Sequence, residues 1–373
     1  MIALTRSDES VFGRWWWTVD RWMLAMIAAL IMFGIILIQA ATPAIAVARG
    51  YGNFHFVQNY LMALVPALAV MIALSIQPLR NIRLTGFAVL PLSIAGILLT
   101  LLLGHDIKGA TRWLHLPGLS LQPSEFAKPA LTIVAAWLFA RHCEKRGFPG
   151  LGVNFMLYAG VSFLLLLQPD FGMCLLIAAV WFGQFFLAGL PLAFVGISFI
   201  LLLAGGIGAY YALPHVQHRI DRFLDPAGGD NYQIERAMDA FTNGGVFGAG
   251  PGEGTVKMSL PDAHSDFIFA VAGEELGLVF CLVIVLLYAA IVLRGFWRRR
   301  REQNLFVVLA ASGLLLQFGL QAIINMASTL RLMPTKGMTL PFISYGGSSL
   351  LALGMAMGML LALTRKRYGA GEN

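Results

Sequence analysis

The chain has 373 residues, of which 58% are hydrophobic and 12% are charged, whereas soluble proteins carry about 25% charged residues. A mean hydropathy of +0.75 indicates that lipid is its main solvent, and the apolar runs leave no stretch for a separate soluble domain. The net charge of +7 is accounted for by cationic flanks of the predicted spans, so it requires no nucleic-acid partner.

Apolar windows of about 20 residues predict about ten transmembrane helices. In chain order they cover residues 22–42, 56–77, 84–104, 124–141, 153–168, 172–189, 191–212, 267–293, 304–330 and 339–363. The fifth and sixth spans are short and flank Gln168-Pro169-Asp170-Phe171-Gly172. A single broken helix there would change the number of spans and invert the topology after it.

The distribution of Lys and Arg predicts that both termini are cytoplasmic, because the inside segments are then richer in cations than the outside segments. We therefore expect an all-α polytopic membrane protein forming a single domain over residues 1–373. Residues 1–21 form a cytoplasmic segment, residues 213–265 a large extracytoplasmic loop between helices 7 and 8, and residues 364–373 a cytoplasmic tail.

The N-terminal segment lacks a small-residue cleavage site after a short apolar core, so it is interpreted as an anchor rather than a signal peptide. Trp15-Trp16-Trp17 is typical of an interfacial aromatic belt. Neither the three cysteines, Cys143, Cys174 and Cys281, nor the histidines have the spacing of a disulfide framework or a metal site.

The loop over residues 213–265 is long enough to suggest a function. Its stretch from Asn231 to Ala240 predicts a short amphipathic helix near the membrane surface. The glycine-rich stretch from Gly244 to Gly254 favours a flexible, turn-rich connection; the alternative is close backbone approach, as in an anion-binding turn.

The stretch from Leu260 to Gly277 carries Asp266, Glu274 and Glu275 into an apolar helix. A central Asp in a membrane costs roughly 2.5–3.5 kcal/mol, so these carboxylates need a reason. Asp266 is expected near the water interface, where a catalytic carboxylate meets both lipid-borne and water-borne substrates. Glu274 and Glu275 lie roughly 12–14 Å deeper on an ideal helix and favour polar packing between helices.

Other polar groups also lie at predicted outer edges. Ser124 is a candidate helix cap, and Asp170 is expected to cap the sixth helix. Glu125 and Lys128 are three residues apart, so they either pair with each other or bind phosphate. Lys336 in the last loop either snorkels to the interface or supplies a point charge for phosphate.

Five motifs in order resemble the SEDS family (shape, elongation, division and sporulation), typified by FtsW and RodA, over essentially the whole chain. The matching segments are Gly109-to-Leu114, Gln122-to-Lys128, Gln168-to-Gly172, Ala263-to-Gly277 and Pro334-to-Ser349. The last segment, with its lysine, looks like the FtsW branch, most similar to the alphaproteobacterial type. Ser265 and Asp262 depart conservatively from the family pattern, where Thr and Glu are common.

This resemblance implies a glycosyltransferase that polymerises lipid II into a growing glycan strand at the division septum of the bacterial inner membrane. It also implies a class B penicillin-binding protein as partner, together with other divisome membrane proteins. The essential aspartate of the family maps to Asp266, the arginine of its first motif to Arg112, and its last-loop lysine to Lys336.

The expected chemistry follows from charge. Cations at the interface stabilise the diphosphate that leaves as the glycosidic bond forms, and Arg112, Lys128, Lys336 and Arg219 are available outside. Asp266 is the proposed general base for the acceptor hydroxyl.

Glu125, His264 and Ser344 are further candidates for substrate binding or orientation. No cofactor is certain, although Mg²⁺ or Mn²⁺ carried with the diphosphate fits such a site. Three alternatives stay open: a lipid II flippase or transporter, a non-catalytic divisome scaffold, and a RodA-like role in elongation instead of division.

Overall fold

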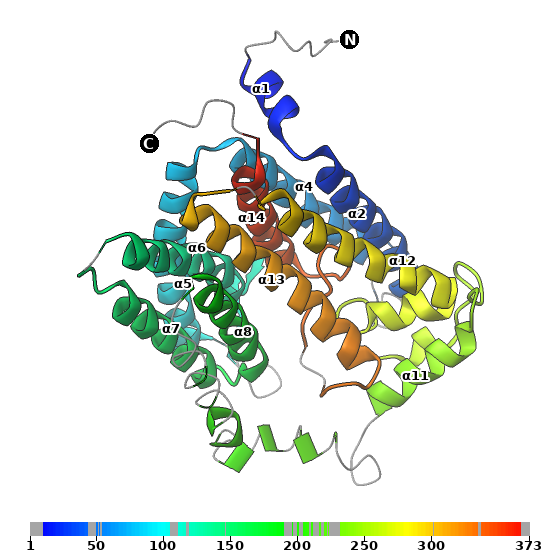
Figure 1. Ribbon diagram of the computed structural model, residues 1–373. Coiled ribbons are helices and arrows are strands. Elements are labelled where there is room, and N and C mark those ends of the chain that lie inside the picture. Colours follow the sequence, from blue (N-terminus) through cyan, green and yellow to red (C-terminus); the bar gives the residue numbers. More distant parts are fainter. Residues whose placement is uncertain are drawn as a thin grey trace.

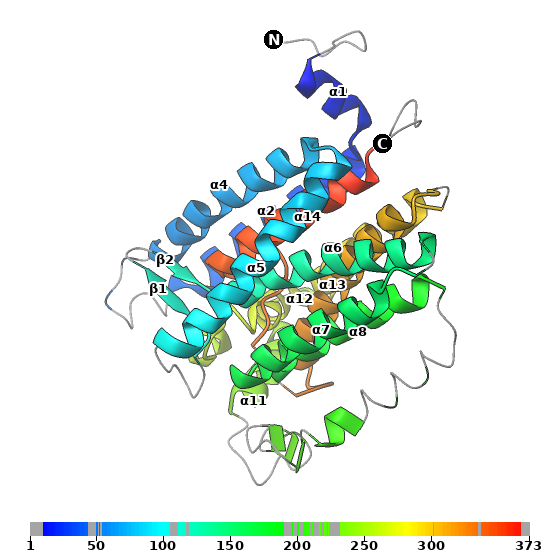
Figure 2. The same ribbon diagram turned by 90° about the vertical axis from the view of Figure 1, so that its left-hand side faces the viewer.

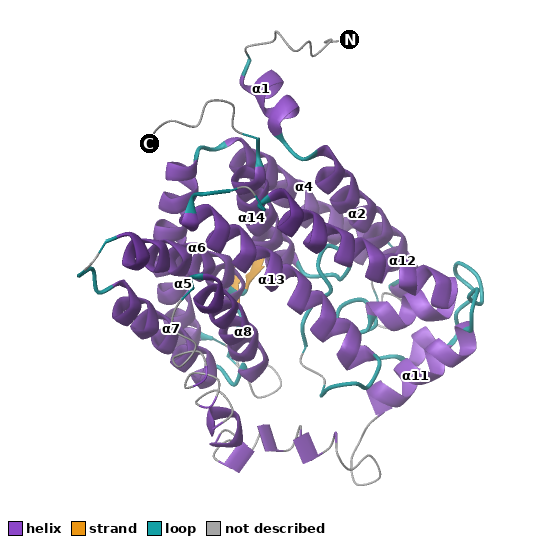
Figure 3. Ribbon diagram, in the orientation of Figure 1, coloured by secondary structure: helices purple, strands orange, loops and turns teal. Residues whose placement is uncertain are grey.

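The computed structural model is almost entirely helical (Figure 1 and Figure 3). It describes residues 10–43, 50, 52, 54–104, 111–116, 119–145, 147–189, 232–300, 302–334 and 337–366, with scattered residues between 196 and 223. The helices are α1 (Val11–Thr18), α2 (Arg21–Ala41), α4 (His55–Ile76), α5 (Leu79–Leu103), α6 (Pro123–Glu144), α7 (Gly150–Leu167), α8 (Phe171–Leu187), α11 (Tyr232–Gly244), η1 (Val256–Ser259), α12 (Ile268–Arg298), α13 (Leu305–Thr329) and α14 (Gly347–Thr364). An antiparallel hairpin of β1 (Leu114–Leu116) and β2 (Leu119–Leu121) was not predicted.

The helical fold class is confirmed. Seven described helices are long and apolar enough to cross a membrane, namely α2, α4, α5, α7, α12, α13 and α14. The shorter α8 and the more polar α6 coincide with two further predicted spans. Helices are required here because a chain in lipid must satisfy its backbone hydrogen bonds within itself. The seventh predicted span, residues 191–212, lies largely outside the described residues.

The fifth and sixth predicted spans are two separate helices. α7 ends at Leu167 and α8 begins at Phe171, and the two helices pack side by side (Figure 2). The Asp170 side chain accepts a hydrogen bond from the Met173 amide at 3.3 Å, so the prediction that it caps this helix is confirmed. Ser124 does not cap α6, because the cap position is Gln122, whose own side chain makes no capping hydrogen bond.

Two predicted spans need correction. The eighth is broken at Gly277, whose backbone has φ 77° and ψ −179°, so the helix is kinked near the two glutamates. The last helix begins at Gly347 rather than at residue 339. The preceding turn includes Phe342 at φ 61°, and the buried Ser344 hydroxyl accepts a hydrogen bond from the Leu340 amide at 2.8 Å. The apolar pattern alone does not reveal this turn, because its side chains are buried.

The core is centred on α13 and α14, which neighbouring helices surround. Gly354 and Gly358 of α14 lie against α4, where a Cβ would stand 2.3 Å from the Ala67 carbonyl and 2.6 Å from the Met71 carbonyl. Small residues spaced four apart let membrane helices approach closely. In lipid the hydrophobic effect does not drive helices together, so the van der Waals contact at such close approach stabilises their packing.

Helix α1 and the end of α14 lie at one end of the helix bundle, and α11 lies toward the opposite end in both views (Figure 1 and Figure 2). The end with α11, the β1–β2 hairpin and the start of α12 is called the outer face, and the end with Thr18, Arg298 and Lys366 is called the terminal face. The predicted topology assigns them to the extracytoplasmic and cytoplasmic sides.

Candidate active site

Asp266 lies in a tight turn just before α12. Its amide donates to the Asp262 carbonyl at 3.1 Å, and Asp262 itself has φ 55°. The Asp266 residue is half-buried. Gly337 lies beside it, so that a Cβ on this glycine would stand 3.5 Å from Asp266 Oδ2. The carboxylate is therefore held between the start of α12 and the last loop, and it keeps an accessible surface.

Asn325 of α13 fixes these two segments relative to each other. Its side-chain amide donates to the Asp266 carbonyl at 2.9 Å and to the Met338 carbonyl at 2.6 Å. Asn325 is buried, so neither bond has to compete with bulk water. The position of Asp266 consequently depends on a residue that the sequence analysis did not single out.

His264 and Ser344 join the same two segments. The His264 ring lies between Phe56 and Tyr345, with centroids 5.1 and 5.5 Å away, and its carbonyl accepts from the Tyr345 amide at 2.9 Å. Ser344 donates to the Ser265 carbonyl at 2.5 Å. Both residues are buried and hold backbone in place, which gives them a positioning role. Their prediction as substrate-binding residues stays a prediction.

Glu125 and Lys128 form the ion pair that was one of the two predicted alternatives. Lys128 Nζ lies 2.9 Å from Glu125 Oε2 and donates to Gln321 Oε1 at 3.0 Å. Gln321 in turn donates to the Thr339 carbonyl at 3.0 Å. Both charges are buried, so they lie inside the helix bundle and are linked to the last loop. Their binding of phosphate is untested and stays a prediction.

Arg112 binds the turn between α7 and α8. Its Nε donates to the Gln168 carbonyl at 3.0 Å, its Nη2 donates to the Pro169 carbonyl, and its Nη1 lies 3.7 Å from Asp170. Burial raises the pKa of the Asp170 carboxyl above its ordinary value, against the opposing effect of Arg112. The two hydrogen bonds use two of the five guanidinium N–H donors, so Arg112 braces the turn and retains donors for a ligand.

Three amide side chains on one face of α13 were missed. Gln317, Gln321 and Asn325 follow one another at four-residue spacing, and all three are buried. Gln317 accepts from Thr132 at 3.2 Å, and the other two reach Lys128 and the Asp266 carbonyl. Their spacing within an apolar helix was a signal available in the sequence, because polar groups inside a membrane span need partners.

Glu274 and Glu275 bind the segment that follows the glycine-rich stretch. Oε1 of Glu274 accepts from the amides of Thr255 and Val256 at 2.8 and 2.7 Å, and Oε2 accepts from the Lys257 amide at 2.8 Å. Lys257 Nζ pairs with the buried Glu275 carboxylate. The predicted role in polar packing holds for both glutamates, with the outer loop as their partner rather than another membrane helix.

The glycine-rich stretch is packed on α12, so the favoured interpretation of a flexible connection is wrong. The amides of Ala249 and Gly250 donate to the carbonyls of Glu274 and Glu275 at 2.9 and 3.0 Å. A Cβ on Gly277 would stand 2.4 Å from the Gly248 nitrogen, so the two backbones touch at the kink. The close backbone approach of the alternative is observed, and its use as an anion-binding turn stays a prediction.

The remaining predictions near this site are only partly covered by the structure. Lys336 and Arg219 lie outside the described residues. The short amphipathic helix is confirmed as α11. In the described part of the chain, no group of three or more His, Cys, Asp or Glu residues is placed to hold a metal ion.

These features define a class: a polytopic α-helical membrane protein with a half-buried carboxylate at its outer face and buried ion pairs behind it. The family profile of the FtsW, RodA and SpoVE proteins, described as cell cycle protein, matches residues 21–369. The chain belongs to this family.

Known proteins are similar to this chain along nearly its full length. The chain is 43% identical over 369 residues to a probable peptidoglycan glycosyltransferase FtsW of Caulobacter vibrioides, covering 99% of this chain and 95% of that one. A chain from a structure titled as a peptidoglycan synthase complex that coordinates polymerization and crosslinking superposes with a TM-score of 0.75 at 27% identity, covering 93% and 97%. The rod shape determining protein RodA of Thermus thermophilus superposes with a TM-score of 0.70 at 25% identity, covering 94% and 97%.

Proposed function

We propose that this protein is a peptidoglycan glycosyltransferase that polymerises lipid II, with Asp266 as its general base. The observation that carries the proposal is the placement of the half-buried Asp266 at the outer face, where Asn325 holds its backbone carbonyl and Gly337 borders its carboxylate. The names of the full-length relatives, probable peptidoglycan glycosyltransferases, support the same activity.

In the proposed reaction, a sugar hydroxyl of one substrate attacks the anomeric carbon of another. The new C–O glycosidic bond forms as the bond to the diphosphate breaks, the diphosphate leaves, and the hydroxyl proton passes to Asp266. A carboxylate positioned near the hydroxyl serves as this base. One base is sufficient for inversion by direct displacement, whereas retaining glycosidases use a second carboxylate as nucleophile.

Cations near the outer face would stabilise the leaving diphosphate. Arg112 is half-buried and retains unused donors, and Lys336 and Arg219 remain candidates from the sequence. Lys128 is buried against Glu125 and Gln321. We therefore assign it a structural role, which is to hold the last loop through Gln321, rather than a role in contacting the substrate. A divalent cation would enter with the diphosphate.

We further propose that the protein acts in the bacterial inner membrane at the division septum, beside a class B penicillin-binding protein and other divisome membrane proteins. The name of the Caulobacter relative favours division, whereas the RodA resemblance is structural and of lower identity. Depletion followed by microscopy separates the roles, because loss of a division enzyme gives filaments and loss of an elongation enzyme gives rounded cells.

The proposed activity is tested with purified protein and fluorescent lipid II, comparing wild type with Asp266→Ala and Asp266→Asn. We expect both variants to insert and fold normally and to make no glycan ladder. Asp239→Ala is a matched control, because this exposed aspartate of α11 lies on the same face and pairs with Arg236.

Ladders of normal length from folded Asp266→Ala protein would refute the assignment of the base. Transbilayer movement of lipid II without any ladder from the wild type would instead support a transporter. If neither occurs while the partner still binds, the scaffold alternative gains support.

A further inference from the structure

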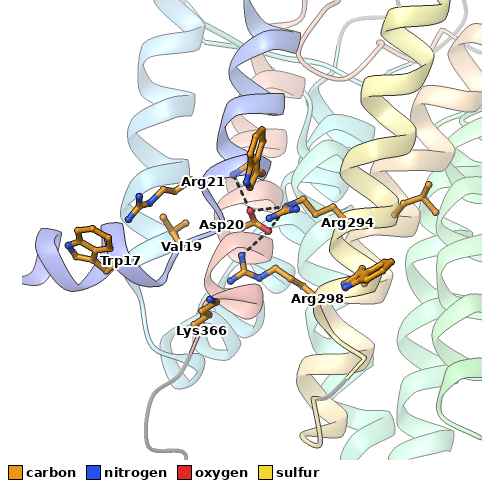
Figure 4. A pocket seen from close by; sticks show the side chains of 10 residues that line it. Trp17, Val19, Asp20, Arg21, Arg294, Arg298 and Lys366 are labelled. Carbon is orange, nitrogen blue, oxygen red and sulfur yellow. Dashed lines mark hydrogen bonds and ion pairs between the residues drawn. The ribbon is translucent and has the colours of Figure 1, made fainter. Parts of the chain in front are cut away.

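A cavity of about 1180 Å³ lies at the terminal face (Figure 4), at the opposite end of α12 from Asp266. It is bounded by the junction of α1 and α2, by the last turns of α12 and by the segment after α14. Its lining residues are Trp17, Val19, Asp20, Arg21, Trp22, Leu293, Arg294, Trp297, Arg298 and Lys366. None of them has a part in the proposed glycosyl transfer.

The cavity has an excess of positive charge. Four of its described lining residues are cations, and the sole carboxylate among them is Asp20. Asp20 is buried and accepts from Arg294 Nε at 2.8 Å, with Arg298 Nη1 also at 2.8 Å (Figure 4). Burial acts to raise the pKa of this carboxyl, but the hydrogen bonds from the two arginines hold it below its ordinary value.

The other two cations of the cavity have no such carboxylate. Within the described part of the chain, Arg21 and Lys366 form no ion pair; Arg21 lies over the Trp17 ring at 4.4 Å, and the Lys366 backbone amide binds the Thr18 carbonyl at 3.0 Å. Both side chains are exposed. They remain available to an anion that enters the cavity.

A neighbouring arginine adds to the excess of positive charge at the cavity. Arg299, just past the cavity, is 7% exposed, and its Nε and Nη1 have no hydrogen-bond partner in the described structure. Burial lowers the pKa of this guanidinium to about 10, so it stays charged at neutral pH. The end of α12 therefore carries more positive charge than its carboxylate neighbours neutralise.

The rim of the cavity is apolar and aromatic. Trp22, Trp297 and Leu293 are 70%, 72% and 68% exposed. Exposed tryptophans at the ends of membrane helices are typical of the headgroup level, and leucine is typical of the acyl region. An amphiphile with an anionic head and an apolar tail matches this arrangement better than a wholly polar acidic peptide does.

We propose that this cavity binds the phosphate of an anionic phospholipid from the leaflet at the terminal face. Arg21 and Lys366 contact the phosphate, Trp22 and Trp297 flank the headgroup, and Leu293 contacts the start of an acyl chain. Basic pockets at the cytoplasmic ends of membrane helices suit anionic headgroups for these electrostatic reasons.

The test uses purified full-length protein in zwitterionic detergent, titrated separately with phosphatidylglycerol, phosphatidylethanolamine and inorganic phosphate, with lipid adducts measured by native mass spectrometry. We expect phosphatidylglycerol to bind more tightly than the other two. A cation near a membrane surface contributes about fivefold in affinity, so the Arg21→Gln/Lys366→Gln variant is expected to bind phosphatidylglycerol about 25-fold more weakly.

Arg80→Gln/Arg83→Gln is the matched control, because it removes two cations at the start of α5 that do not line the cavity. It is expected to bind as the wild type does. The single variant Lys366→Gln is also measured, together with its unfolding temperature without lipid. Weaker binding at an unchanged unfolding temperature would show that the loss of affinity is not caused by a folding defect.

An equal loss of phosphatidylglycerol affinity in the Arg21→Gln/Lys366→Gln variant and in the Arg80→Gln/Arg83→Gln variant would overturn the proposal. Equal binding of the two lipids would also overturn it, because the net charge of the headgroup would then not matter. Equal binding of inorganic phosphate would show that an acyl chain is not required, which likewise refutes a lipid site. Each of these outcomes is independent of whether Asp266 is the catalytic base.

Discussion

Replacing Glu274 by alanine tests the most specific polar arrangement in this structure. The carboxylate is fully buried and accepts from the amides of Thr255, Val256 and Lys257, and from the Asn243 side chain at 2.9 Å. Glu274→Ala would leave three backbone donors without their acceptor. An unsatisfied buried donor costs about 1–3 kcal/mol, and the bonds of Thr255 and Val256 are only partly buried, so the expected loss lies in the lower half of a range of about 3–9 kcal/mol.

This loss is large beside the total stability of a protein, which is about 5–15 kcal/mol. Water entering the space left by the side chain would move the loss toward the lower value. Glu274→Gln keeps one acceptor oxygen but turns an amide donor toward one of the backbone donors, so we expect a smaller loss of about 1–3 kcal/mol.

The assay is thermal unfolding of purified protein in detergent, followed by tryptophan fluorescence, together with limited proteolysis of the loop at residues 245–259. The expected order of midpoints is Glu274→Ala below Glu274→Gln, and both below wild type. Glu253→Gln is the control, because Glu253 lies exposed on the same loop. An alanine variant that unfolds at the wild-type temperature with an intact loop would refute the reasoning.

Three further predictions follow from buried contacts. Lys128→Met should destabilise the protein by about 3–5 kcal/mol, because it leaves the Glu125 carboxylate buried and unpaired; adding Glu125→Gln should recover much of this, measured as a coupling energy in a double-mutant cycle. Gly277→Ala should cost more than about 2 kcal/mol in unfolding measurements, because its φ of 77° is unfavourable with a Cβ and its neighbour is 2.4 Å away. Asp20→Asn should destabilise the protein at neutral pH. Because the pKa of Asp20 is lowered in the folded state, this contribution is present above its ordinary value of 3.8 and is lost as pH falls through the folded value, so melting curves of wild type and variant should converge in acid.

The sequence predicted the spans well where a single physical rule decided them. Long apolar runs in lipid must become helices, and Asp170 after Pro169 had a local reason to start one. The rule failed where burial in protein resembles burial in lipid. Residues 339–346 are apolar enough to extend a span, yet they form a turn held by Ser344.

The sequence by itself also determined the membrane class, the family resemblance and Asp266 as the candidate base, because composition and local motifs carry that information. Apart from the local pair of Glu125 and Lys128, the partners of the buried charges were decided by the tertiary structure. Asp20 meets Arg294 across 274 positions, and Asn325 reaches the Asp266 carbonyl across 59. Helix packing decides which distant groups meet, and a buried charge or amide is stable only where that packing supplies its partner.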